Sequence, residues 1–211
     1  MRMRAATLSG VKQPLIVQEV ELDEPKANEV LVRMVASGVC HSDLHVITGD
    51  IDRPYPVILG HEGAGIVEQV GPGVTKVKPG DHVVLTYLPA CGKCQWCHRG
   101  FPNMCDQGQH LRSGKMLDQT SRLHTLDGQD ISNFLFVSTW AEYSVVPELS
   151  VVLVPDYVPL EKACLFGCGF STGLARRPMP CTSALERASP SWAAGGWARR
   201  PSRGHASVTR A

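Results

Sequence analysis

Residues 91–105 read CGKCQWCHRGFPNMC, and this stretch holds four cysteines: Cys91, Cys94, Cys97 and Cys105. Cys-x-x-Cys spacing lets one tight turn present two sulfurs to a single ion, and four thiolates complete the tetrahedral shell of a structural zinc. All four positions of that shell are then filled, so none stays open for water. The stretch therefore predicts a structural zinc lobe over residues 88–110. The spacing alone also leaves open an iron–sulfur site or free thiols.

The chain as a whole has the composition of a globular protein. Of its 211 residues, 43% are hydrophobic and 19% are charged, which excludes disorder throughout the chain. Its apolar runs stay short of the ~18 residues that cross a bilayer, and no apolar run follows the basic start Met1-Arg-Met-Arg as in a signal peptide. We therefore expect a cytoplasmic protein with no membrane partner, in which clustered cysteines bind metal rather than form disulfides.

Charge is distributed unevenly along the chain. Residues 1–174 carry 14 basic and 19 acidic side chains, whereas residues 175–211 carry 7 arginines and one acid, Glu186. The second segment is mostly Ala, Arg, Ser, Pro and Gly without apolar periodicity, so we expect a disordered or non-native tail. The amino-acid composition of this segment is the one expected when a G/C-rich gene is translated in the wrong reading frame. The alternative is a genuine arginine-rich tail that binds nucleic acid or anionic surfaces, but the absence of a folded nucleic-acid-binding motif makes nucleic acid an unexpected partner.

The first 155 residues have the pattern of short strands separated by turns. Strands are predicted at 14–20, 30–35, 65–70 and 82–85, and the run 145–154 predicts two strands broken near Pro147. Turn signals at intervals of roughly ten residues favour a small barrel or sandwich. Residues 159–163 have the pattern of a first helical turn. We therefore predict a mainly β domain with a few short helices over residues 1–155, followed by a connecting segment at 156–174.

Three further segments carry side chains that bind metals. Residues 40–45 read CHSDLH, residues 60–65 read GHEGAG, and residues 167–173 read GCGFSTG. Taken singly, Cys40 and Cys168 fit small buried apolar residues, and His61 fits a loop histidine. Spacing alone therefore leaves open whether these three residues form one site.

Together these motifs resemble the zinc-containing medium-chain alcohol dehydrogenases. The segment GHEGAG at 60–65, with Gly71 and Val74 beyond the next strand, is similar to the zinc signature of that family. The four-cysteine lobe is similar to the structural-zinc loop of the family, and the segment 167–173 to the part that carries its third catalytic ligand. The resemblance covers nearly all of residues 5–174 and implies a GroES-like β-barrel or sandwich catalytic domain.

The resemblance also implies a second, catalytic zinc. Its protein ligands would be Cys40, His61 and Cys168, with water in the fourth position. Glu62 would lie beside the metal, either as an alternate ligand or as a group that contacts the ligands, and Asp43 would orient the His61 ring by accepting its other N–H. The implied activity is oxidation of a primary or aromatic alcohol to the aldehyde, or the reverse, by hydride transfer to NAD.

Four more residues receive roles from the resemblance. The proton of the alcohol would leave through the Ser42 hydroxyl, the cofactor ribose and then His45 near the surface. His41 would meet the pyrophosphate of the cofactor, and Thr172 would pack near its nicotinamide. The family also implies a homo-oligomer.

The chain departs from the family pattern after residue 174. No Gly-x-Gly-x-x-Gly turn follows, nor does an acid placed to bind the cofactor ribose. We therefore expect the chain as written to show little or no NAD-dependent alcohol oxidation. The alternative function is that of a binding or interaction protein, a zinc-stabilised β domain with a cationic tail. A zinc reductase or hydratase relative would use the same ligands.

Overall fold

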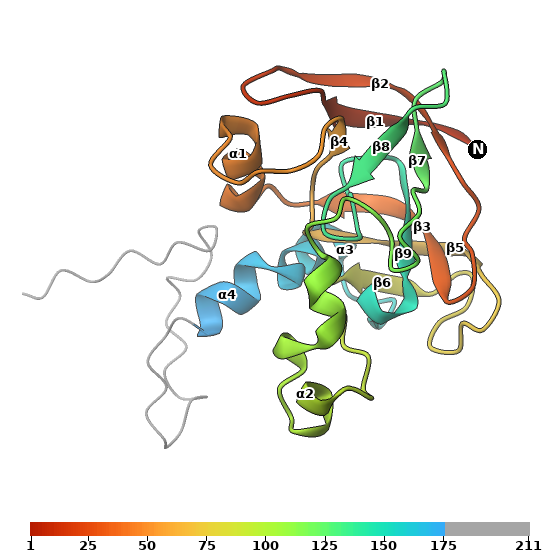
Figure 1. The fold of residues 1–211 in the computed structure, drawn as a ribbon. Coiled ribbons are helices and arrows are strands. Elements are labelled where there is room, and N and C mark those ends of the chain that lie inside the picture. Colours follow the sequence, from red (N-terminus) through yellow and green to blue (C-terminus); the bar gives the residue numbers. More distant parts are fainter. Residues whose placement is uncertain (176–211) are drawn as a thin grey trace, which may run out of the picture.

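The computed structural model describes residues 1–175, and the predicted tail beyond Ala175 lies outside the described residues. Two β-sheets make up most of the described part, with short helices between the strands (Figure 1), which confirms the prediction of a mainly β fold. The predicted zinc lobe projects from the sheets around helix α2, at the bottom of the view in Figure 1.

The first sheet closes into a barrel with the strand order β1-β2-β7-β8-β4. Its strands are β1 (Arg2–Leu8), β2 (Leu15–Leu22), β7 (Leu123–His124), β8 (Asp130–Asn133) and β4 (Val57–Ile58). Side chains alternate along β1, so Met3 and Ala5 are buried whereas the neighbouring arginines are exposed. Inside the barrel these residues pack against apolar side chains of the other strands, including Val20, Ile58 and Ile131.

The second sheet contains five strands in the order β10-β6-β5-β3-β9. They are β10 (Val151–Leu153), β6 (His82–Leu85), β5 (Gly63–Val70), β3 (Glu29–Ser37) and β9 (Tyr143–Pro147). Strand β3 pairs with both β5 and β9, and its Val30 and Val32 are buried in a core with Val67 of β5. A side chain at Gly65 would start 2.2 Å from the carbonyl oxygen of Arg33, so β3 and β5 can lie this close only with glycine there.

The helices of the described part are short. The α-helices are α1 (His41–Thr48), α2 (Gln95–His98), α3 (Leu160–Ala163) and α4 (Gly169–Ala175), and the turns of 3-10 helix are η1 (Pro102–Met104), η2 (Asp106–His110), η3 (Glu148–Ser150) and η4 (Cys164–Gly167). Helix α1 follows Cys40, whose backbone N–H donates to Asp43 Oδ2 at 3.0 Å. It ends at Gly49, which has a φ of 87°, a left-handed conformation that glycine adopts at low cost.

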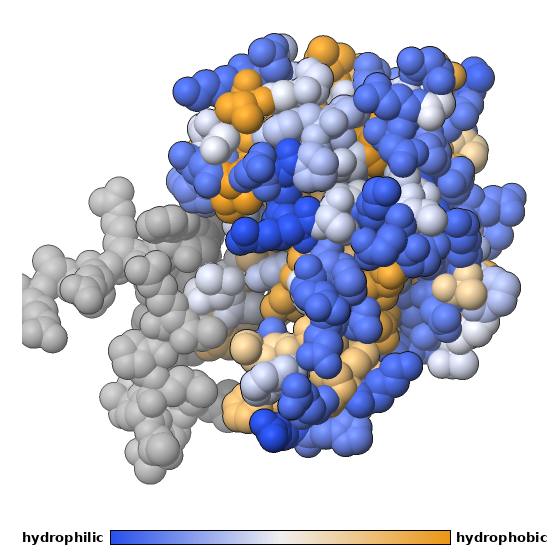
Figure 2. All heavy atoms as spheres, viewed as in Figure 1, coloured by the Kyte–Doolittle hydropathy of each residue, from blue (hydrophilic) through white to orange (hydrophobic). Residues whose placement is uncertain are grey.

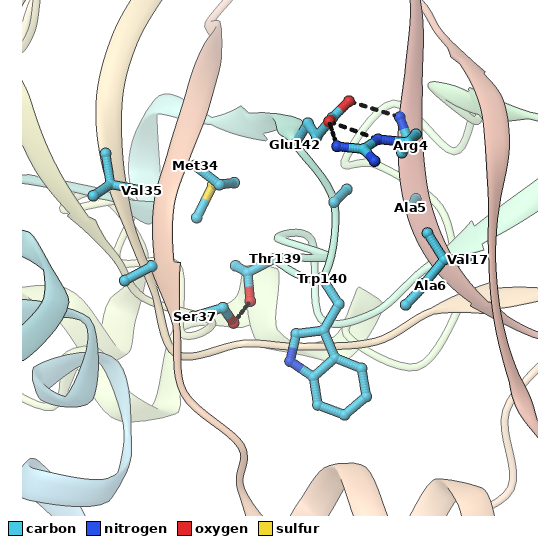
Figure 3. A pocket seen from close by; sticks show the side chains of 12 residues that line it. Arg4, Ala5, Ala6, Val17, Met34, Val35, Ser37, Thr139, Trp140 and Glu142 are labelled. Atoms are coloured by element: carbon cyan, nitrogen blue, oxygen red, sulfur yellow. Dashed lines mark hydrogen bonds and ion pairs between the residues drawn. The ribbon is translucent and has the colours of Figure 1, made fainter.

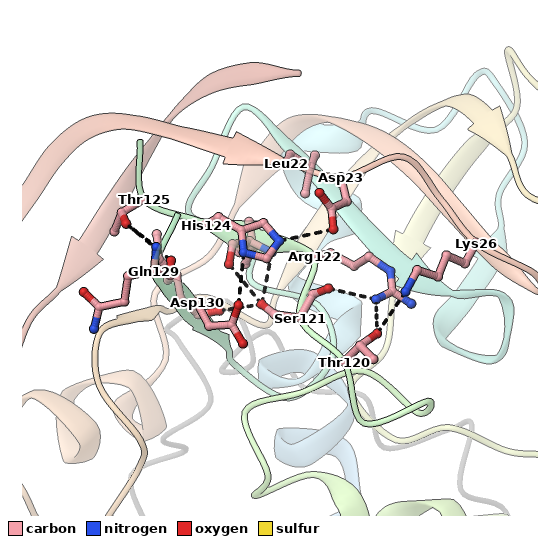
Figure 4. A network of polar contacts seen from close by, with 12 residues as sticks. Leu22, Asp23, Lys26, Thr120, Ser121, Arg122, His124, Thr125, Gln129 and Asp130 are labelled. Atoms are coloured by element: carbon pink, nitrogen blue, oxygen red, sulfur yellow. Dashed lines mark hydrogen bonds and ion pairs between the residues drawn. The ribbon is translucent and has the colours of Figure 1, made fainter. Parts of the chain in front are cut away.

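A buried arginine joins the barrel to the start of β3. Arg122 is 1% exposed, and its Nε and Nη2 donate to the two carboxylate oxygens of Glu29 at 2.8 and 2.6 Å. Its Nη2 also lies 2.7 Å from Asp118 Oδ2. Figure 4 shows Arg122 beside Thr120, and His124 facing Asp23 in the same network. The bidentate contact of Arg122 with Glu29 fixes the loop that precedes β7 against β3.

The surface of the described part carries an apolar region near the C-terminal helices. In Figure 2 hydrophobic residues gather in the lower centre of a mostly hydrophilic face, where α3, α4 and the zinc lobe lie. The exposed large apolar side chains of η4 and α4 include Leu165, Phe166 and Leu174. Within residues 1–175, none of the helices has the length and apolar character needed to cross a membrane.

Candidate metal centres

The fold brings metal-binding side chains into two groups of four within residues 1–175. In each group, one ligand atom per residue lies within 4.8 Å of every other. The first group is Cys91, Cys94, Cys97 and Cys105, and the second is Cys40, His61, Glu62 and Cys168. Both sets of residues are those singled out from the sequence.

The four-cysteine group is organised by backbone N–H groups. Cys94 is the residue that precedes α2, and the N–H of Cys91 donates to Cys105 Sγ at 3.4 Å. Hydrogen bonds from the backbone of Cys97 and Asp106 lower the pKa of the Cys94 thiol to about 6. Burial, in contrast, raises the pKa of Cys97 to about 11. Since neighbouring thiolates repel one another, this donor set needs a cation to hold all four sulfurs in the charged form, which fits zinc.

The second group is assembled from three segments that are far apart in the sequence. Cys40 follows β3, His61 and Glu62 precede β5, and Cys168 lies between η4 and α4. The pairing of β3 with β5 runs as far as Ser37 opposite Gly63, which brings the first two segments together. A side chain at Gly167 would start 2.5 Å from the carbonyl oxygen of Leu85. Glycine there therefore lets the third segment approach β6.

The buried carboxylate of Asp43 holds two of these segments in place. Asp43 is 0% exposed, and its Oδ1 lies 3.3 Å from His61 Nδ1 and accepts the backbone N–H of Gly60 at 3.1 Å. Its Oδ2 accepts the N–H of Cys40 at 3.0 Å. With Nδ1 hydrogen-bonded to a carboxylate, His61 keeps Nε2 as the nitrogen available to a metal.

The charges of the second group favour an ionised thiol next to a histidine. Hydrogen bonds with the Cys168 thiol and with His61 lower the pKa of Cys40 to about 3, and the same pairing raises the pKa of Cys168. Burial opposes a charged His61, but hydrogen bonds to Asp43 and Cys40 outweigh it and raise its pKa to about 9. A thiolate, a second thiol and a buried imidazole together form a donor set that suits zinc.

Glu62 lies within the same group and is held by the backbone. Its side chain is 3% exposed, and its Oε1 accepts the N–H of Gly169 at 2.9 Å. Burial, followed by the charge of Cys40, raises the pKa of this carboxyl. The carboxylate is therefore near enough to the thiols to reach a shared metal ion, although Gly169 already occupies one of its oxygens.

The other residues singled out from the sequence lie around the second group. Ser42 Oγ is 3.8 Å from Cys40 Sγ, and Thr172 Oγ1 is 3.7 Å from Cys168 Sγ. Further along α1, His45 Nδ1 lies 3.2 Å from Asp50 Oδ2, and its ring meets that of His41 edge-on with centroids 4.6 Å apart. The hydroxyls thus adjoin the candidate ligands, whereas the two histidines lie toward the surface.

Two aromatic residues beside His61 were missed by sequence reasoning. The rings of Tyr87 and Phe134 meet the imidazole edge-on, with centroids 5.5 and 5.6 Å away. Tyr87 follows β6, and Phe134 follows β8 and is 2% exposed. The apolar run at 134–137 was a signal for burial, but its contact with His61 depends on the closure of the barrel.

A separate cavity of about 470 Å³ opens between β1 and β3 (Figure 3). Trp140 points into it, and Thr139 and Ser37 share a hydrogen bond of 2.6 Å at its wall. The ion pair of Arg4 with Glu142 lies at its edge. None of the candidate metal ligands lines this cavity, so it is distinct from both metal-binding groups.

Replacing Asp43 is expected to weaken metal binding by the second group alone. The substitution Asp43→Asn removes the charge that holds His61 in its orientation, and loss of such a partner costs about 10- to 100-fold in metal affinity. Zinc affinity measured by competition with a chromogenic chelator would test this expectation. Asp81→Asn, which changes a carboxylate paired with Lys78 far from the group, is the matched control. Equal affinities in all three proteins would contradict the assigned position of Asp43.

Comparison with protein families gives one match that covers most of the described chain. The model of the alcohol dehydrogenase GroES-like domain matches residues 26–156. The matched range contains the four-cysteine group together with the first three members of the second group.

Similar proteins and solved structures carry related names. The chain is 46% identical to an NDMA-dependent alcohol dehydrogenase of Amycolatopsis methanolica over 83% of its own length and 47% of that protein. It resembles the crystal structures of an alcohol dehydrogenase zinc-binding domain protein from Burkholderia ambifaria (TM-score 0.78, 39% identity) and of benzyl alcohol dehydrogenase from Acinetobacter calcoaceticus (TM-score 0.75, 36% identity). Each of these matches covers 82% of this chain and 47% of the solved one. The chain thus spans about half the length of the relatives that it matches.

Proposed function

Because this chain belongs to the zinc-containing medium-chain alcohol dehydrogenase family and carries its GroES-like domain, we propose that it acts as the zinc-binding catalytic domain of an alcohol dehydrogenase. The proposed reaction oxidises a primary or aromatic alcohol to the aldehyde, or runs in reverse, with hydride transfer to or from NAD. The observation that carries the proposal is the convergence of Cys40, His61 and Cys168 from three separate segments.

Two different zinc sites are proposed. Four thiolates in the lobe would hold a structural zinc, since they leave no position free for a substrate. Cys40, His61 and Cys168 would hold a catalytic zinc with one position open, and Glu62 is the alternate ligand. When bound there, zinc acts as a Lewis acid that polarises the alcohol oxygen and lowers the pKa of the hydroxyl.

The residues around the second group would position the ligands and move the proton. Asp43 fixes the His61 ring by the contact at Nδ1, so that Nε2 would be the nitrogen that holds the ion. Ser42 has its hydroxyl beside Cys40 Sγ and is proposed to take the alcohol proton. His45 lies at the partly exposed end of this path, where an imidazole can release a proton to solvent.

Cofactor contacts are proposed for two exposed residues near the same group. His41 begins α1, and Thr172 lies in α4 with its Oγ1 beside Cys168 Sγ. We propose that His41 meets the pyrophosphate of NAD and that Thr172 packs against its nicotinamide. A homo-oligomer is the proposed assembly, with the alcohol and its aldehyde as the small-molecule partners.

Zinc analysis of three proteins tests whether the two sites are separate. The wild-type chain is expected to hold two zinc ions, and the variants Cys91→Ser and Cys168→Ser one each, because each serine removes one thiolate from a different group. Mass spectrometry under native conditions gives the zinc count for each protein. Two ions in Cys168→Ser, or one ion in the wild type, would rule out the proposed catalytic site.

Cobalt substitution then tests whether an alcohol reaches the ion. Benzyl alcohol is expected to shift the visible absorption of the cobalt-substituted wild type, because a ligand that enters the open position changes the coordination sphere. The same shift is expected in Cys91→Ser and is expected to be absent in Cys168→Ser. A spectrum that benzyl alcohol leaves unchanged in the wild type would contradict an open, substrate-binding position.

A further inference from the structure

Helix α1 carries two histidines on one accessible face. His41 and His45 stand at positions i and i+4, which places their side chains next to each other on the helix. His41 is exposed, and 41% of the His45 side chain is exposed. Their rings meet edge-on with centroids 4.6 Å apart. The same spacing of two histidines on a helix binds zinc in the His-Glu-x-x-His motif of metalloproteases.

The carboxylate of Asp50 orients the second of these rings. His45 Nδ1 lies 3.2 Å from Asp50 Oδ2, and Thr48 Oγ1 lies 2.6 Å from the same oxygen. Hydrogen bonds with Thr48 and His45 lower the pKa of the Asp50 carboxyl, so it is an anion at neutral pH. Because a carboxylate only accepts hydrogen bonds, a neutral His45 ring donates its Nδ1–H and keeps the lone pair of Nε2.

A histidine held in this way is prepared for a metal ion. Histidines that bind metals almost always donate their other ring N–H to a carboxylate, a carbonyl oxygen or water, and Asp43 has the same relation to His61 in the second metal-binding group. His41 adds a second imidazole beside His45, and imidazole nitrogens suit zinc. His124 differs, because each of its ring nitrogens lies 3.1 Å from a carboxylate and neither is left for a metal.

We propose that His41 and His45 form a third metal site, which binds a zinc ion through one nitrogen of each ring. Water completes the coordination, because no third metal-binding side chain within residues 1–175 joins this pair in one group. Two protein ligands hold an ion less tightly than three or four, so this zinc exchanges with solvent. The site therefore fills only when zinc is in excess over the ions held by the two groups of four.

This site does not depend on the proposed function, since neither of its ligands belongs to the two groups of four. A filled site engages both rings and makes them unavailable for the cofactor and proton roles proposed above. That consequence alone rests on the proposed function.

Calorimetric titration with zinc chloride tests the proposal on the full chain, first saturated with zinc and then desalted. The wild type is expected to bind one additional ion. His41→Gln and His45→Gln are each expected to weaken its binding by more than about 10-fold, because loss of a ligand costs at least as much as loss of the group that orients it. Asp50→Asn is expected to weaken it by about 10-fold. His124→Gln removes a histidine outside the pair and is the matched control, expected to bind the additional ion as the wild type does.

Nuclear magnetic resonance of the ring nitrogens identifies the atoms that hold the additional ion. Zinc is expected to shift the Nε2 signal of His45 and to leave its Nδ1 protonated, because Asp50 accepts that proton. One ring nitrogen of His41 is expected to shift at the same zinc concentration. A shift confined to His45 would contradict a site shared by the two rings.

Three results of the titration would overturn the proposal. One is a wild type that binds no additional ion, and another is an unchanged affinity in either His41→Gln or His45→Gln. The third is an equal loss in His124→Gln, which would mean that zinc binds surface histidines without selection. Cys168→Ser is expected to keep the additional ion, whereas the proposed function is tested by the ions that survive desalting. Failure of either proposal therefore leaves the other standing.

Discussion

Arg122→Met is expected to lower the free energy of unfolding by about 3–5 kcal/mol, the range for removing one partner of a buried ion pair. Arg122 is 1% exposed and satisfies both carboxylate oxygens of Glu29, which is itself 8% exposed. Methionine keeps much of the volume but removes the cation from the buried Glu29 carboxylate, which keeps the backbone N–H of Lys26 as a donor to Oε2 at 2.9 Å. Urea denaturation of the zinc-loaded chain, followed by tryptophan fluorescence, measures the loss.

Arg33→Met is the matched control for this substitution. Arg33 pairs with Glu68 at 2.6 Å, but both side chains are about 40% exposed, and ion pairs of this kind contribute little to stability. Its unfolding midpoint is therefore expected to stay close to that of wild type. Equal losses in the two variants would mean that burial of the Arg122 pair has no special energetic effect.

The contribution of Asp118, in the same network, to the free energy of unfolding depends on pH. Burial opposes the charged form of Asp118, but hydrogen bonds from Arg122 and Thr120 outweigh it and hold its pKa well below the usual range. A carboxyl with a lowered folded pKa contributes stability above its unfolded pKa of about 3.9 and loses that contribution as the pH falls through the folded pKa. Asp118→Asn is therefore expected to be less stable than wild type at pH 7, and the difference is expected to shrink as the medium becomes more acidic than about pH 4.

Most strands of the second sheet could be predicted because they follow simple rules. β6 lies at His82–Leu85 as predicted, and β5 and β3 extend the predicted runs by a few residues at their ends. The break near Pro147 is also confirmed, since β9 ends there and η3 begins after it. These strands are rich in valine and are bounded by turn residues, so local pattern and tertiary structure agree.

The missed elements depend on contacts between distant residues. β1 alternates Arg2 and Arg4 on the outside with Met3 and Ala5 inside, a pattern that lacks a continuous apolar run. α1 follows a cysteine rather than a common capping residue, and it is held by Asp43, which also accepts the backbone N–H of Gly60 in the loop between β4 and β5. β4 and β7 consist of two residues each, and strands this short exist only because the barrel closes around them.

The candidate site could be predicted in its residues but not in its surroundings. Spacing within 15 residues indicated the four-cysteine group, and a resemblance was needed to join Cys40, His61 and Cys168, which no local pattern connects. The stacking of Arg53 on Phe134 and the contact of Glu62 with Gly169 arise only from the folded chain. Their sequence neighbourhoods carried no signal for either contact.

Removal of zinc from the lobe is expected to unfold residues 88–110 while both sheets stay folded. Neither α2 nor η1 has a buried residue, and between residues 90 and 110 only Cys105 is buried. The lobe thus has almost no apolar core, whereas the binding of a structural zinc contributes about 10–16 kcal/mol. Cys97→Ser is expected to raise the exchange rates of the amides of His98 and Phe101 by about 100-fold or more, since a loss of about 3 kcal/mol already has that effect.

Hydrogen exchange followed by mass spectrometry measures this change peptide by peptide. The amides of His98 and Phe101 donate to the carbonyl oxygens of Cys94 and Trp96 at 3.0 and 2.9 Å, so they report directly on the lobe. Peptides from β3 and β5 are expected to keep wild-type protection, because their core contains no residue of the lobe. Cys164→Ser, at a buried cysteine outside both metal-binding groups, is the matched control and should leave the lobe protected. Unchanged protection of the lobe in Cys97→Ser would mean that hydrogen bonds, and not zinc, hold these residues in place.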